Sequence, residues 1–94
     1  GQFLINPYGL LFEEITASSL VLIDLDGNQL AESDYTVNVA GFVIHGAIHS
    51  ARHDAACVLH THSDASVAVS GQKDGLLPLS QFAMRFYQRQ AFHP

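Results

Sequence analysis

Residues 38–63 read NVAGFVIHGAIHSARHDAACVLHTHS, and this stretch decides the predicted fold. Its first part predicts a helix over roughly residues 40–52, with Asn38 as the N-cap. Its second part, residues 55–61, predicts a strand. The helix carries an apolar stripe at helical spacing, of the kind that faces a core, formed by Ala40, Val43, Ile44, Ala47, Ile48 and Ala51.

Shorter elements flank this stretch on both sides. Val21, Ile23 and Leu25 alternate with period two, which makes residues 20–25 the clearest strand before it. Gly27 fits a hairpin turn after that strand, because glycine tolerates a positive φ. The other predicted elements are a strand at 3–5, a turn at 6–9, a helical turn within 10–15, a return strand at 29–30, a loop at 31–36, a short helix capped by Ser63 or Asp64 that ends at Gly71, a helix at 80–88 and a strand or loop at 91–93. Strands alternating with helices favour an α/β or α+β fold.

The composition excludes several classes of protein. The chain has 94 residues, of which 48% are hydrophobic and 14% charged, a globular balance rather than a disordered one. Four Lys and Arg against nine Asp and Glu give a net charge of −5, which disfavours nucleic-acid partners and anionic membrane surfaces. No run of about 18–20 apolar residues is present, so we expect no membrane insertion. The single cysteine, Cys57, excludes an internal disulfide and fits a reducing compartment, so we expect a cytoplasmic protein.

The sharpest chemical motif is the pair His60 and His62. On a strand, residues i and i+2 point to the same face, so the two imidazoles would lie side by side at the strand's end. A catalytic zinc needs about three protein ligands and an open position, and this pair would supply two of the three. The alternative is a pair of ordinary histidines bonded to backbone or water. Cys57 has the opposite parity, so we expect it to be a small buried hydrophobic residue rather than a third ligand.

A second arrangement is His45 and His49, four residues apart on the predicted helix. This spacing can bind a metal from one helix face. No glutamate stands between them, so the metalloprotease motif is absent. The preferred interpretation is a helix edge that packs against the sheet, with the imidazoles bonded to neighbours. We expect His53 beyond the helix end, and His93 supports no interpretation by itself.

Five segments stand out in this order: residues 3–11 (FLINPYGLL), 14–21 (EITASSLV), 37–45 (VNVAGFVIH), 58–62 (VLHTH) and 75–80 (GLLPLS). Together they resemble the class II aldolase/adducin domain family, and most of all its adducin-head-like members. The segment VLHTH resembles the family's His-x-His zinc motif. The likeness covers nearly the whole chain.

The resemblance implies a three-layer α/β/α fold, with a mixed, largely antiparallel sheet flanked by helices. Residues 1–94 would then be a single, partial domain of this family, and the usual assembly a homotetramer with sites between subunits. His60 and His62 would hold zinc or another divalent metal, together with a third histidine beyond residue 94. The metal would polarise a small sugar or sugar phosphate in a lyase reaction, while a nearby acid moves the proton.

The chain departs from the enzymes of this family at the catalytic acid. Those enzymes carry it at the start of the helix before the metal segment, where this chain reads NVAG (residues 38–41) without a carboxylate. We therefore assign no catalytic residue, and the missing acid argues against retro-aldol chemistry. Two hypotheses follow: a metal-dependent lyase-type enzyme, or a non-catalytic adducin-like domain for oligomerisation and protein interaction. An unrelated α/β domain with incidental histidines is a third interpretation.

Overall fold

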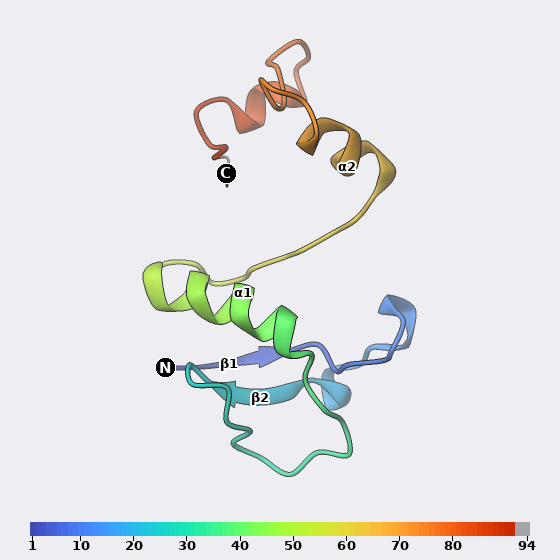
Figure 1. The fold of residues 1–94 in the computed structure, drawn as a ribbon, viewed down its shortest axis with the longest axis vertical. Coiled ribbons are helices and arrows are strands. Elements are labelled where there is room, and N and C mark those ends of the chain that lie inside the picture. Colours follow the sequence, from blue (N-terminus) through green and yellow to red (C-terminus); the bar gives the residue numbers. More distant parts are fainter. Residues whose placement is uncertain (92–94) are drawn as a thin grey trace. The chain divides into compact units, whose positions relative to one another are not determined.

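A computed structural model describes residues 1–91, and the chain divides into two compact units, residues 1–58 and the part from Leu59 onward. The first unit holds both strands and the longer helix, and the second holds the shorter helix (Figure 1). The elements are β1 (Gln2–Ile5), the 3-10 turns η1 (Phe12–Glu14) and η2 (Ala17–Ser19), β2 (Val21–Asp24), α1 (Val39–Ala51), α2 (Asp64–Ser70) and the 3-10 turn η3 (Ala83–Phe86). No helix within residues 1–91 is long and apolar enough to cross a membrane.

β1 and β2 form an antiparallel pair, as the sequence predicts for both segments. The register sets Phe3 opposite Ile23 and Ile5 opposite Val21. Side chains alternate across a strand, and this alternation leaves Val21 and Ile23 with 0% exposure and Ile5 with 8%. These three residues are the core of the first unit.

The hairpin turn after β2 is confirmed. Gly27 has φ = +88°, in the region that favours glycine. The Asp24 carboxylate organises the turn, because its Oδ1 accepts from the backbone N–H groups of Asp26 (2.9 Å) and Asn28 (2.8 Å). Its Oδ2 accepts from the Asn28 side-chain amide at 2.9 Å. The predicted return strand is reduced to a single bridge between Ile23 and Gln29.

α1 lies beside the two strands (Figure 1) and begins as predicted. The Asn38 Oδ1 accepts from the Ala40 N–H at 3.0 Å, which confirms it as the N-cap. The helix turns its Phe42 side toward the sheet, where Phe42 packs against the core. Gly46, also on this side, is buried, and a Cβ there would approach the Phe42 ring to 3.0 Å.

The apolar stripe predicted for α1 therefore does not face this core. Val43 is 59% exposed and Ile44 45% exposed. At about 100° per residue, the stripe lies roughly opposite the side that carries Phe42 and Gly46. The prediction was wrong because apolar periodicity marks an apolar face of a helix but not the surface that this face meets, and here the Phe42 side meets the strands.

Two further elements differ from their predictions. Residues 55–61 form no strand, because a strand needs a hydrogen-bonded neighbour and the sheet within residues 1–91 contains only β1 and β2. The helix predicted at 80–88 is reduced to η3. α2 ends before Gly71 as predicted, although Gly71 has φ = −81° rather than a left-handed conformation.

Part of the fold prediction goes beyond this structure. The helices and the antiparallel strand pair are present, whereas the three-layer arrangement and the single partial domain at residues 1–94 stay predictions. The strand or loop predicted at 91–93 extends outside the described residues.

Candidate metal centre

His60 and His62 bring two imidazole nitrogens together in the segment before α2. Their Nε2 atoms lie 2.6 Å apart. The ring centroids are 4.6 Å apart and the ring planes meet at 64°. Both residues are exposed. The i, i+2 spacing thus places the two rings on one side, as predicted, although the backbone is not a strand.

This geometry fits the donor set of a divalent metal. Imidazole nitrogens lie about 2.0–2.1 Å from zinc, so two of them on a tetrahedral ion are about 3.3 Å apart. The Nε2 atoms of His60 and His62, now 2.6 Å apart, would need to separate by about 0.7 Å. Because both side chains are exposed, small rotations about their χ angles can supply this separation.

The described residues supply no third ligand. No group of three or more His, Cys, Asp or Glu side chains that could hold a metal occurs within residues 1–91. His93 lies outside the described part of the chain. Cys57 is exposed, so its predicted burial was wrong, because the predicted strand around it is missing.

The second pair, His45 and His49, lies on α1. Both residues are half-buried, and the His49 ring packs on Phe3 of β1 with centroids 4.7 Å apart and planes tilted by 39°. His49 therefore packs against the sheet, as the preferred interpretation holds.

A tight turn follows α1. The Ala55 N–H donates to the Arg52 carbonyl at 3.0 Å. Across the turn, the Arg52 guanidinium donates from Nε to Asp54 Oδ1 at 2.8 Å and from Nη2 to Oδ2 at 2.7 Å. These hydrogen bonds lower the pKa of the Asp54 carboxyl to about 2 and raise that of the guanidinium. His53 is thereby held in a defined turn just beyond the helix, as predicted.

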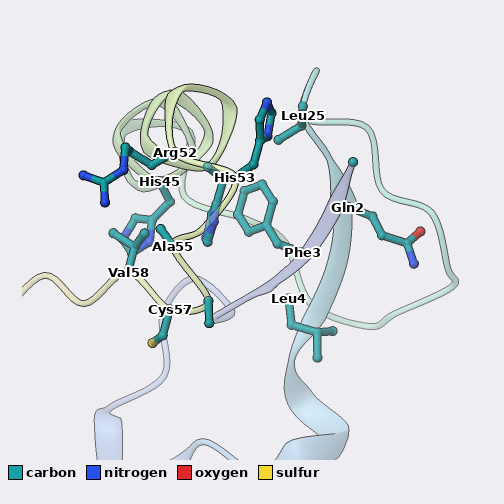
Figure 2. A pocket seen from close by; sticks show the side chains of 13 residues that line it. Gln2, Phe3, Leu4, Leu25, His45, Arg52, His53, Ala55, Cys57 and Val58 are labelled. Carbon is teal, nitrogen blue, oxygen red and sulfur yellow. The ribbon is translucent and has the colours of Figure 1, made fainter.

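The first unit also contains a cavity of about 600 Å³, at the C-terminal end of α1 (Figure 2). Three histidines at successive spacings of four, His45, His49 and His53, line it together with apolar side chains such as Phe3 and Leu25. The sequence analysis missed this grouping. The spacing of four residues between these histidines is the signal in the sequence that could have revealed it.

The start of α1 holds no acid. Residues 39–41 form the first turn of the helix, which contains no acidic side chain, and the Asn38 oxygen is occupied as the N-cap. The position at which the resemblance implies a catalytic acid is therefore without a carboxylate in this structure as well as in the sequence.

Comparisons with known proteins agree on one family. A protein of Pseudomonas aeruginosa, provisionally assigned as an aldolase class 2 protein, is 56% identical over 92 residues, which are 98% of this chain and 36% of that protein. Rat alpha-adducin is 50% identical over 85 residues, covering 88% of this chain and 12% of adducin. The crystal structure of an aldolase II superfamily protein from Pseudomonas syringae superposes with a TM-score of 0.92 at 56% identity, covering 98% of this chain and 38% of that one. The chain thus spans well under half the length of these relatives. The family described as the Class II Aldolase and Adducin N-terminal domain matches residues 1–94 in full, and the chain belongs to this family.

Proposed function

We propose that this protein is a divalent-metal-dependent enzyme of the class II aldolase/adducin family, with His60 and His62 as two of its metal ligands. The observation that carries the proposal is the approach of the two Nε2 atoms to 2.6 Å in an exposed segment. Zinc is the metal we propose, because neutral imidazole is among its preferred ligands. The third ligand lies outside the described residues.

The chain's own residues define what the site contributes. His60 and His62 offer two nitrogen lone pairs on one side of the segment. A divalent ion bound there supplies Lewis-acid polarisation of a substrate oxygen. Because the first turn of α1 has no carboxylate, the group that moves the proton must come from elsewhere in the protein. A reaction that needs no acid at this position, such as decarboxylation, dehydration or epimerisation, therefore suits the chain better than aldol cleavage.

The substrate class follows from the family and is part of the proposal. We propose a small sugar or sugar phosphate, because the provisional class 2 aldolase of P. aeruginosa shares 56% of the aligned residues. We also propose a homotetramer and a cytoplasmic location, the latter because a single cysteine fits a reducing compartment.

A second candidate function rests on a separate observation. The chain lacks the acid at the start of α1 and is 50% identical to rat alpha-adducin over 85 residues. An adducin-like domain would keep the fold and its contacts with other proteins but perform no chemistry. In that case His60 and His62 would only hydrogen-bond with each other, and replacing one would alter stability by about 1 kcal/mol.

Metal analysis separates the two functions. The protein, purified without a nickel column or affinity tag, should contain about one zinc or similar ion per chain by mass spectrometry. The double variant His60→Gln/His62→Gln should contain none and should keep its circular dichroism spectrum. His53→Gln, which removes a histidine outside the pair, is the matched control and should retain the metal. Metal-free wild-type protein that cannot be reloaded with zinc would refute the enzyme proposal and favour the adducin-like function.

A further inference from the structure

The hairpin turn after β2 carries a reactive pair of neighbours, Asp26 and Gly27. Aspartate followed by glycine occurs twice in the chain, here and at residues 74–75. In such a pair the backbone nitrogen of the glycine can attack the side-chain carboxyl that precedes it, because glycine has no Cβ to obstruct the approach. The surroundings of each pair then determine how fast it reacts.

Both reacting groups of the Asp26–Gly27 pair are accessible. The two residues are exposed, and the Asp26 carboxylate makes no hydrogen bond or ion pair with any other residue in the range 1–91. The Gly27 N–H donates to the Asp24 carbonyl at 3.3 Å, which is longer than most hydrogen bonds of this kind. Solvent water therefore reaches the pair directly.

We propose that Asp26 is a site of spontaneous conversion to isoaspartate, at a rate that the Asp24 carboxylate limits. In the first step the Gly27 nitrogen forms a bond to Cγ of the protonated Asp26 carboxyl. The nitrogen loses its hydrogen and the carboxyl loses its hydroxyl, so a water molecule leaves and a succinimide ring remains. In the second step water adds to the ring carbonyl that belonged to the backbone, and the original bond from that carbon to the Gly27 nitrogen breaks. The backbone then runs through Cβ and Cγ of Asp26, and the former backbone carbonyl is a carboxylate.

The folded turn resists the first step. The hydrogen bond from the Gly27 N–H to the Asp24 carbonyl places Asp26 at the third position of a β-turn, where ψ is about 0° in both common types. At this ψ the Gly27 nitrogen is turned away from the Asp26 side chain, so the turn must open before the ring can close. Asp24 opposes the opening, because its Oδ1 accepts from the N–H groups of Asp26 and Asn28 and its Oδ2 accepts from the Asn28 side chain.

The product fits the turn less well than aspartate does. Isoaspartate lengthens the backbone between Cα of Asp26 and the Gly27 nitrogen by a methylene group. Gly27 lies so close to the Phe42 ring that a Cβ there would approach it to 2.9 Å. We expect the longer backbone to disturb this contact and, through Phe42, the packing of α1 on the core.

The test follows isoaspartate at both Asp-Gly pairs of the same molecule. The protein is incubated for weeks at neutral pH and physiological temperature and then digested. Isoaspartate has the same mass as aspartate, so chromatographic retention and methylation by an L-isoaspartyl methyltransferase identify it in each peptide. Asp24→Asn keeps the size of the side chain but loses one acceptor, and it should accelerate conversion at Asp26 about fivefold, the effect of about one net hydrogen bond. The rate at Asp74, in the second unit, should stay within about twofold of the wild type.

Two further variants make the test specific. Asn28→Ala removes the partner of the Asp24 Oδ2 and should also accelerate conversion, which guards against a general loss of structure in Asp24→Asn. Asp26→Glu keeps the carboxylate but would have to close a larger ring, so the isoaspartate signal at this pair should disappear while that at Asp74 remains. Wild-type protein unfolded in urea gives the reference rates of both pairs. Absence of isoaspartate at Asp26 in the folded protein, over a period in which the unfolded protein accumulates it, would overturn the proposal. An unchanged rate at Asp26 in both Asp24→Asn and Asn28→Ala would do the same.

Discussion

The orientation of α1 can be tested by comparing two neighbouring positions, Phe42 and Val43. In the structure, Phe42 packs on the core. Its ring lies so close to Gly46 and Gly27 that a Cβ at either glycine would come within about 3 Å of it. Val43 is 59% exposed. Apolar periodicity alone would assign Val43 to the core. The effects of Phe42→Ala and Val43→Ala on stability therefore distinguish the two orientations.

The expected magnitudes follow from burial. A fully buried Phe→Ala substitution costs about 3–5 kcal/mol, so about 2 kcal/mol is reasonable for the half-buried Phe42. The better helix propensity of alanine offsets about 0.5 kcal/mol of this loss. Val43→Ala removes two carbons worth about 0.8 kcal/mol each when fully buried, or about 0.7 kcal/mol in total at this exposure. The gain in helix propensity cancels nearly all of that loss.

Native-state amide hydrogen exchange in β2 is the appropriate assay, because it reports the opening free energy of the strand beneath α1. Phe42→Ala should accelerate exchange of the protected β2 amides about tenfold, which corresponds to about 1.5 kcal/mol. Val43→Ala should leave their rates unchanged within about twofold. If Val43→Ala accelerated exchange as much as Phe42→Ala, the helix orientation and the placement of the histidines that line the cavity would both be refuted.

Three other predictions concern turns and charges. Gly27→Ala should destabilise the first unit by more than Gly9→Ala. Both glycines have φ near +90°, but only at Gly27 would the new Cβ meet a ring, that of Phe42 at 2.9 Å. Urea denaturation of the two variants measures the difference in the free energy of unfolding. Hydrogen bonds from the Asn28 side chain and backbone lower the pKa of Asp24, so its contribution to stability is present above about pH 4 and is lost as the pH falls through the lowered value. The protection factors of the hairpin amides, which correct for the intrinsic slowing of exchange in acid, should fall over this range, and Asp24→Asn should remove that fall. The Asp54 carboxyl should titrate near 2 by NMR, and Arg52→Gln should return its pKa toward the ordinary range; an unchanged value would mean that the ion pair does not form in solution.

The local elements of this fold could be predicted wherever adjacent residues determine them. Period-two alternation identified β2, the side-chain oxygen of Asn38 marked the start of α1, and Gly27 marked the hairpin turn. The strand predicted at residues 55–61 was wrong because its formation depends on a neighbouring strand, which local sequence does not specify. The prediction of which side of α1 packs on the strands was wrong, because the fit between Phe42 and Gly46 depends on the shape of the surface beneath them.

The candidate metal pair was accessible from the sequence for a different reason. Any extended backbone places residues i and i+2 on one side, so His60 and His62 could meet even though the predicted strand is absent. The histidine-lined cavity was harder to predict. It depends on where His53 lies after the helix ends, which is set by the turn that Arg52 and Asp54 close.

A hydrogen bond between two Nε2 atoms also fixes the tautomers of His60 and His62 when both rings are neutral. The donor ring carries its hydrogen on Nε2, whereas the acceptor ring carries it on Nδ1. Two Nε2 lone pairs become available together only when both rings are Nδ1–H tautomers. One hydrogen must therefore leave Nε2 and return at Nδ1 of the same ring, and it travels through water or buffer because the two nitrogens are not adjacent. We expect the rate of metal uptake to rise with the concentration of a proton-carrying buffer that does not itself bind metal, while the affinity stays the same.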